Sequence, residues 1–507
     1  MDKGTAKEKE KILMSGQKKT VLASGVLYAA FMAAYTDYLA YGPAGRAISI
    51  AACLLVLAAA LAAFRYGLLL ALLFLFTFPS FPRDILDIYP ALRDTADMSF
   101  YSINYTQAAG FSLSMWMMAG LSAIALMRFL SRGGRMEGGE PGRLIALLFC
   151  FIVLLFPGAL QSAFLGRDFY LKEFISDLRF PLLFIAGGVA AWEYAQDSGG
   201  VSEAIRKIMG LLVFILAVSG MKTVFFLLDD RLNGNLRLGF ANPVYLVFPF
   251  LLAWAAGKEE TGFRIEEPVF ILLGAAAVFP EGRGAVIIYV LATILAFMVT
   301  FIKERARMAG FTGMALMTVS GIALSVFAVS LVNGRLWNFL AFKMSFFTNE
   351  LWTGELSESP LSRVYELKNI MAENADTITG LLWGRGAGSY FTFRHFPLAW
   401  NFEAPDYTLF EREAGIYFHP HLPLNYWLLK GGVLGLAIYG YVFLKMFRTG
   451  YAGVSLTGRS QEKGFAFFLA VSSVTGFFQS FWQPAYIFFY SLVMTLGLML
   501  LERGAEG

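Results

Sequence analysis

The chain is poor in the side chains that most soluble enzymes use for chemistry. Its 507 residues include only two cysteines and three histidines, and charged residues make up 15%. Cys53 and Cys150 both lie in apolar runs, so we expect them to pack as small hydrophobic residues; neither a disulfide framework nor a cysteine metal site can be built from them. What the chain has in quantity is apolar surface, with 57% hydrophobic residues and 50 phenylalanines. This composition argues strongly against a large soluble helical protein.

Long apolar runs predict an all-α integral membrane protein. A helix needs about 17–25 apolar residues to cross a hydrocarbon core of roughly 30 Å. By this criterion we expect about 12–14 transmembrane helices. The predicted spans are residues 21–41, 46–64, 67–81, 106–130, 144–162, 179–195, 208–228, 242–256, 267–281, 284–302, 310–332, 425–446, 464–482 and 485–501.

Basic residues set the predicted orientation, because loops rich in Lys and Arg stay in the cytoplasm. They cluster in the N-terminal tail, in the loop near 128–143, after the span that ends at 302, and after the span that ends at 446. Both termini are therefore predicted to be cytoplasmic, and residues 333–424 to form one large external loop. The net charge of +4 belongs to the cytoplasmic loops and gives no reason to expect nucleic acid as a partner.

The predicted organisation is one membrane domain with one large insertion. It comprises a basic cytoplasmic tail (1–20), transmembrane helices (21–332), the external loop (333–424), further transmembrane helices (425–501) and a short cytoplasmic tail (502–507). The first span lacks a clear signal-peptide cleavage site, so we expect it to remain as an anchor. A loop of this length is far longer than ordinary connections, and such loops usually carry function.

All three histidines, His395, His419 and His421, fall in that loop. Histidine titrates near neutral pH and is the most frequent general base. His421 lies four residues before Asn425, where the next span begins, and so lies at most roughly 15 Å from the membrane boundary. That is the depth of the head group of a lipid-linked substrate. We therefore predict His421 as the catalytic base, with His419 as the second candidate.

The loop also carries helical signals. Ser359-Pro360 is a typical helix start, and the apolar residues that follow, to about Asp376, have helical spacing. Arg363 and Glu366 are three residues apart and are predicted to pair on one face. Residues 336–347 mix aromatic residues with a lysine, as an interfacial helix does. Both helices are expected to lie flat on the outer leaflet.

A glycine-rich run, residues 384–389 (GRGAGS), lies in the same loop. A nucleotide-binding glycine loop follows a strand and opens a helix within a βαβ unit, and no such unit surrounds this run. Nucleotide binding is therefore not expected, although a tight turn that offers backbone amides to an anion remains open.

Four short motifs connect the chain to a known family. They are Gly239-Phe240-Ala241-Asn242-Pro243; Glu281-Gly282-Arg283-Gly284-Ala285; Ser362-Arg363 followed by the glycine run; and Pro420-His421 followed by Gly432-Val433-Leu434-Gly435. In this order they resemble the O-antigen ligase and O-antigen polymerase superfamily of bacterial envelope glycosyltransferases. The resemblance covers roughly residues 235–450. It departs from the family pattern at Gly282, where the family has Ser, and at Leu422, where it commonly has Asn; Asn425 is a candidate for supplying that amide.

The resemblance implies a many-helix protein of the bacterial inner membrane with a large periplasmic loop. It implies transfer of a glycan from undecaprenyl pyrophosphate to the hydroxyl of a lipid-anchored or lipid-linked saccharide. The reaction would be an inverting displacement that needs neither a metal nor another cofactor, with His421 as the base. Arginine binds phosphate oxygens bidentately, so the arginines near predicted external helix ends are the expected pyrophosphate ligands: Arg283, Arg363, Arg237 and Arg179.

Alternatives from other classes stay open. A ligase and a polymerase of lipid-linked repeats differ only in the acceptor, and the single large loop favours the ligase by resemblance. A metal-assisted route could use His419 and His421 or Asp229-Asp230, although their spacing is not typical of a metal site. A flippase or transporter of lipid-linked sugars would share the hydrophobicity, but would place ionisable residues and broken helices near mid-membrane. A membrane scaffold is the remaining possibility.

Overall fold

The computed structural model describes most of the helical part of the chain. The described residues are 24–40, 42–79, 101–104, 106–108, 111–133, 139–164, 170–227, 243–256, 273–274, 277, 283–303, 312–313, 316, 320, 358–397, 407, 409–456, 460–480 and 483–506. The predicted spans 267–281 and 310–332 and the predicted helix 336–347 lie largely or wholly outside them.

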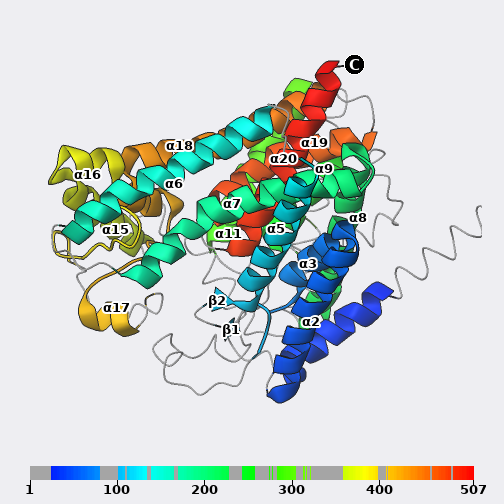
Figure 1. Cartoon of the computed structure of the whole chain (residues 1–507), viewed down its shortest axis with the longest axis horizontal. Coiled ribbons are helices and arrows are strands. Elements are labelled where there is room, and N and C mark those ends of the chain that lie inside the picture. Colours follow the sequence, from blue (N-terminus) through cyan, green and yellow to red (C-terminus); the bar gives the residue numbers. More distant parts are fainter. Residues whose placement is uncertain are drawn as a thin grey trace, which may run out of the picture.

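Helices dominate the described residues (Figure 1). The first part of the chain holds η1 (Tyr35–Leu39), α2 (Pro43–Ala62), α3 (Phe64–Thr77), the short hairpin β1 (Gln107–Ala108) and β2 (Phe111–Ser112), α5 (Leu113–Ser131), α6 (Glu140–Phe164), α7 (Leu171–Asp197), α8 (Val201–Leu227), α9 (Val244–Ala256) and α11 (Arg283–Lys303). The second part holds α15 (Glu358–Ala375), α16 (Ile378–Trp383), α17 (Leu409–Ala414), α18 (Pro423–Leu456), α19 (Ser460–Gln479) and α20 (Pro484–Glu506).

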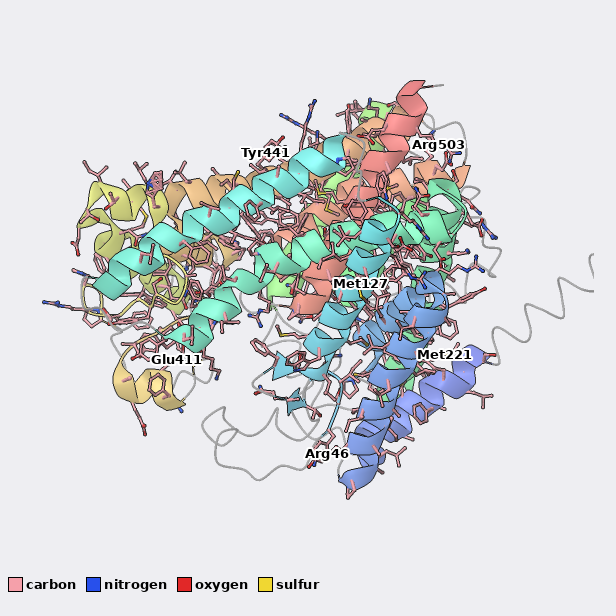
Figure 2. All side chains as sticks on the ribbon, viewed as in Figure 1. Arg46, Met127, Met221, Glu411, Tyr441 and Arg503 are labelled. Carbon is pink, nitrogen blue, oxygen red and sulfur yellow. The ribbon has the colours of Figure 1, made fainter. Side chains whose placement is uncertain are left out.

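Six described helices are long and apolar enough to cross a membrane, which is consistent with an all-α, multi-pass membrane protein. They run over Pro43–Ala62, Leu113–Ser131, Leu171–Asp197, Val201–Phe225, Pro423–Ser455 and Pro484–Arg503. Five shorter apolar helices accompany them, at Ser24–Ala34, Phe64–Thr77, Pro141–Val153, Tyr245–Trp254 and Ile287–Lys303. Large apolar side chains such as Leu54, Phe149 and Tyr441 are exposed, as lipid-facing residues are. Figure 2 labels Tyr441 among them.

Helix α20 forms the centre of the bundle: 83% of its apolar stretch is buried, more than in the other five long apolar helices. Its nearest neighbour is α7, which approaches closely at Gly187: a Cβ there would lie 2.4 Å from the carbonyl oxygen of Phe488. The Ser491 hydroxyl also donates to the Phe184 carbonyl across this contact. Small residues allow such close backbone approach between helices in apolar surroundings.

A charge cluster joins α3, α5 and α7 at one end of the bundle. The carboxylate of Glu193, which is buried, lies 2.9 Å from Arg132 and 3.6 Å from Arg128, and Arg128 also lies 3.7 Å from Asp197. The backbone N–H of Arg65 donates to Asp197 (2.9 Å). Arg128 and Arg132 belong to a loop that the sequence predicts to be cytoplasmic, so this cluster marks the predicted cytoplasmic end.

Helices α15, α16 and α17 gather at the opposite end of the long helices from the C-terminus (Figure 1). Glu411 on α17 and Arg503 near the end of α20 show this separation (Figure 2). The predicted helix start at Ser359-Pro360 is confirmed, since α15 begins at Glu358 and ends at Ala375. A small apolar core of its own joins α15 to α18. It consists of Ile370, Phe391, Tyr407, Tyr417, Leu428 and Leu429.

Helix α18 is broken at Gly432, whose φ of 61° and ψ of −155° are not helical. A break releases the carbonyls that the following residues would have bonded. Three of them are taken from outside the helix: Leu428 O accepts the Asn374 amide (2.7 Å), and Leu429 O and Lys430 O accept the backbone N–H groups of Arg385 and Gly386 (2.8 and 3.0 Å). The glycine run therefore caps the break in α18.

This arrangement predicts that Gly432→Ala destabilises the protein. Alanine is strained at positive φ, and its Cβ would lie 2.5 Å from the Gly384 nitrogen and the Leu382 oxygen. We expect a loss of about 1–3 kcal/mol in unfolding free energy. Gly440→Ala, on the same helix, is the matched control, because nothing lies within 4 Å of its added Cβ. Thermal unfolding in detergent should separate the two variants, and equal melting temperatures would contradict this account of the break.

Candidate functional site

The segment His419-Pro420-His421 lies just before α18, and its two imidazoles enter different surroundings. The His421 ring contacts α15 through Glu366, whereas the His419 ring faces α7 through Glu173. The two histidines are therefore not interchangeable in the structure, although the sequence places them two residues apart.

Glu366 is the centre of the first cluster. Its side chain is fully buried, and its carboxylate accepts hydrogen bonds from His421 Nδ1, Tyr407 OH (2.5 Å), the His421 backbone N–H (3.0 Å) and Asn425 Nδ2 (3.2 Å). Burial alone would raise the pKa of Glu366, but the charge of His421 and these hydrogen bonds outweigh it and lower that pKa. A charged carboxylate that accepts from Nδ1–H fixes the tautomer in which Nε2 carries the basic lone pair.

Neighbouring groups hold the pair of Glu366 and His421 in place. Asn425 is fully buried and also donates to the Arg363 carbonyl (3.0 Å), so one amide links α18 to two positions on α15. The ring of Tyr407 packs edge-on against the His421 imidazole at a centroid distance of 4.9 Å and against Tyr417 at 4.5 Å. The imidazole is thus oriented by the buried carboxylate of Glu366, which Asn425 holds in place, and by the ring of Tyr407.

His419 has a different chemical character. Its Nε2 atom is buried and lies 3.5 Å from Glu173 Oε2, and its ring lies parallel to Tyr426 at 6.3 Å. Burial lowers the pKa of His419 to about 3; Asp177 opposes the shift, while the positive charges of Lys430, Arg179 and Lys172 add to it. A ring with so low a pKa is a poor proton acceptor at neutral pH. The structure therefore favours His421 over His419 as a base.

Beside His419, a buried ion pair joins α7, α18 and the glycine run. Lys430 Nζ lies 2.7 Å from Asp177 Oδ2, and both side chains are essentially inaccessible. Asp177 also accepts from Tyr426 OH (2.5 Å) and from the Gly388 backbone N–H (2.7 Å), while Lys430 donates to the Ser389 carbonyl (2.5 Å). Both charges are paired and hydrogen-bonded, as buried charges must be.

The backbone N–H groups of the glycine run are used inside the protein. Its amides from residue 385 to residue 389 all donate within the protein: to Leu429, Lys430, Leu155, Asp177 and Gly386. The sequence left open that this turn offers a backbone amide to an anion; in the structure, the Gly388 amide binds the internal carboxylate of Asp177. Arg385 is held in turn by Glu373 and by the Tyr390 carbonyl (2.9 Å).

The predicted arginines fall into two groups. Arg363 lies on α15, one turn before Glu366, and Arg179 lies on α7 close enough to His419 to influence its pKa. Arg237 lies outside the described residues. Arg283 is the first residue of α11, as the sequence predicts for a helix start, but its side chain lies outside the described part.

Several functional candidates were not assigned from the sequence. Glu366 was expected to pair with Arg363 on its own helix, and Tyr407, Asp177 and Lys430 were not singled out. For Lys430 and Asp177 a signal existed, because an ionisable residue next to or within a long apolar run is expensive and usually functional. For Glu366 and Tyr407 no local signal existed.

Within the described ranges, no group of three or more His, Cys, Asp or Glu side chains is arranged to hold a metal ion. The chain matches no protein-family model, and no match was found among curated proteins.

The buried state of His419 predicts a pH dependence of stability. Between its usual pKa of 6.5 and the folded value of about 3, the unfolded chain binds a proton that the folded chain does not. The contribution of His419 to stability should therefore fall as pH is lowered through this window. The lowered pKa of Glu366 adds little to the pH dependence between pH 7 and 5. The stability that it contributes is lost only below the usual carboxyl pKa of 4.5.

We expect His419→Gln to lose less thermal stability than the wild type between pH 7 and 5 in detergent. His395→Gln is the control, because His395 is exposed. An unchanged pH dependence in His419→Gln would show that this imidazole is not held neutral in the fold.

Proposed function

We propose that the protein is an O-antigen ligase-like glycosyltransferase that moves a glycan from undecaprenyl pyrophosphate to an acceptor sugar hydroxyl. The observation that carries the proposal is the oriented imidazole of His421, backed by a buried carboxylate at one end of an apolar helical bundle. Three of the sequence motifs, Ser362-Arg363, the glycine run and Pro420-His421 with Gly432, also meet at this place. A family resemblance and an independent geometry thus point to the same residues.

The proposed reaction is a single displacement. His421 Nε2 takes the proton of the acceptor hydroxyl as its oxygen attacks the anomeric carbon; the bond from that carbon to the pyrophosphate oxygen breaks, and the pyrophosphate leaves with the bonding electrons. Glu366 stabilises the imidazolium that forms. Arg363 and Arg179, together with Arg283 and Arg237, are the proposed ligands of the negative charge on pyrophosphate.

The class of acceptor is also part of the proposal. A lipid A-core sugar would make the protein a ligase, and a second lipid-linked repeat would make it a polymerase. Neither reaction needs a metal or a further cofactor in this scheme, because the donor arrives already activated and the charges are supplied by arginine.

One observation favours transport as a second candidate. Transporters place broken helices and ionisable residues at their substrate sites, and α18 combines a break at Gly432 with buried Lys430. In transporters, however, the freed helix ends face the substrate or ions. Here the carbonyls of Leu428, Leu429 and Lys430 accept hydrogen bonds from α15 and the glycine run, which favours a structural role for the break.

The catalytic proposal is tested by His421→Ala. Loss of a general base should lower turnover by about 10²–10⁴-fold, while donor binding persists. His395→Ala, which removes an exposed histidine of the same loop, should transfer at the wild-type rate. The assay is transfer from a synthetic undecaprenyl pyrophosphate donor by purified protein, with and without EDTA. Full activity in His421→Ala, or a loss with EDTA that a divalent ion restores, would replace this mechanism with a metal-assisted one.

The proposed topology places α15 to α17 in the periplasm and both termini in the cytoplasm of a bacterial inner membrane. In a variant without the native cysteines, Asp376→Cys and Ser455→Cys introduce exposed thiols at the two predicted sides. An impermeant thiol reagent should label the first in intact cells and the second only after permeabilisation. Labelling of Ser455→Cys alone would reverse the orientation and remove the basis of the proposed reaction.

A further inference from the structure

Helix α15 buries several polar side chains together with Ile370, and exposes other apolar side chains. Its buried residues include Ser362, Glu366, Asn369, Glu373 and Asn374, whereas Val364 is 39% exposed and Met371 is 41% exposed. On a surface helix of a soluble protein, the buried positions are mostly apolar and the exposed positions mostly polar. On α16, Ile378 is 81% exposed, and Leu381 and Leu382 are exposed as well. We call Val364, Met371, Ile378, Leu381 and Leu382 the outer apolar face.

The buried polar side chains of α15 cannot change places with the exposed apolar ones, because they make hydrogen bonds inside the protein. Glu366 holds His421, as described above. Asn369 accepts the backbone N–H groups of His395 and Phe396 (3.0 and 2.9 Å), and Asn374 donates to Leu428 O (2.7 Å). Rotating the helix would leave these buried polar groups unpaired, which is costly. The exposed apolar side is therefore a fixed consequence of how the site is built.

The depth of α16 follows from its contacts with the bundle. On α7, Glu193 in the charge cluster and Asp177 are 16 positions apart, or about 24 Å at 1.5 Å per residue. A hydrocarbon core is roughly 30 Å thick, so Asp177 lies near the opposite edge of such a layer. Gly388 donates to Asp177, and the backbone at Leu382 meets Gly432 in the break of α18. The end of α16 therefore lies at that edge.

The outer apolar face also continues the apolar exterior of the bundle. Helix α16 packs on α6 and α18 (Figure 1). On α6, Phe149, Val153 and Phe156 are exposed at helical spacing, as a lipid-facing stripe is. On α15, the exposed Lys368 lies between Val364 and Met371, where its long side chain can keep an ammonium at the level of lipid phosphates.

We propose that the outer apolar face of α15 and α16 docks into the boundary between head groups and acyl chains of a phospholipid bilayer. This docking keeps the His421 imidazole at the depth of the sugar–pyrophosphate bond of a lipid-linked donor. The docking rests on the topology proposed above, and its consequence for His421 rests on the proposed reaction.

Environment-sensitive fluorophores test it directly. In full-length protein without its native cysteines, a single cysteine replaces Met371 or Ile378 and carries a nitrobenzoxadiazole label. The protein is reconstituted into vesicles of phosphatidylethanolamine and phosphatidylglycerol, with and without lipids spin-labelled near the top of the acyl chain. The control label sits at Glu413, which is exposed on α17 outside the apolar face.

We expect emission from positions 371 and 378 at shorter wavelength than from 413, and strong quenching by the spin-labelled lipid at 371 and 378 only. The same result should hold in His421→Ala, so that loss of catalysis and loss of docking are distinguishable. Water-like, unquenched emission at 371 and 378 would overturn the proposal and leave this face for a protein partner.

Discussion

The buried negative charge of Glu366 is the constraint on which the rest of the site depends. An isolated carboxylate is expensive to bury, so the fold must bring donors to it. They come from two segments that are far from Glu366 in the sequence: His421 and Asn425, before and within the first turn of α18, and Tyr407, before α17. The need to satisfy one carboxylate thus fixes where α15 lies against α18, and the same contacts orient the imidazole. Stability and proposed catalysis are linked at this residue.

A second buried carboxylate attaches this unit to the bundle. Asp177 on α7 holds Lys430, Tyr426 and the glycine run, and the glycine run in turn caps the break in α18. The break has a clear consequence. It separates the first turns of α18, which follow the histidine segment, from the rest of α18, which continues as an apolar helix. Because Gly384 and Gly432 meet backbone to backbone, neither position tolerates a side chain without movement.

Much of this architecture could be predicted from local sequence. Apolar runs gave most of the described helices, the Ser359-Pro360 pair gave the start of α15, and the position of the histidines singled out the site. Long-range pairing could not be predicted. Glu366 and His421 are 55 residues apart, and the only local partner for Glu366 in the sequence was Arg363. The break in α18 had a signal in the adjacent glycines Gly431-Gly432 within an apolar run. The burial of polar side chains on α15 had none, because helical spacing alone does not say which face is buried.

Glu366 and His421 are proposed to act as one functional unit, and a double-mutant cycle tests this most directly. Turnover of a synthetic undecaprenyl pyrophosphate donor would be compared in the wild type, Glu366→Gln, His421→Ala and the double variant. If the carboxylate acts through the imidazole, Glu366→Gln should lose about 10²-fold or more, and the double variant should be no slower than His421→Ala alone. Losses that multiply in the double variant, or full activity in Glu366→Gln, would contradict the account.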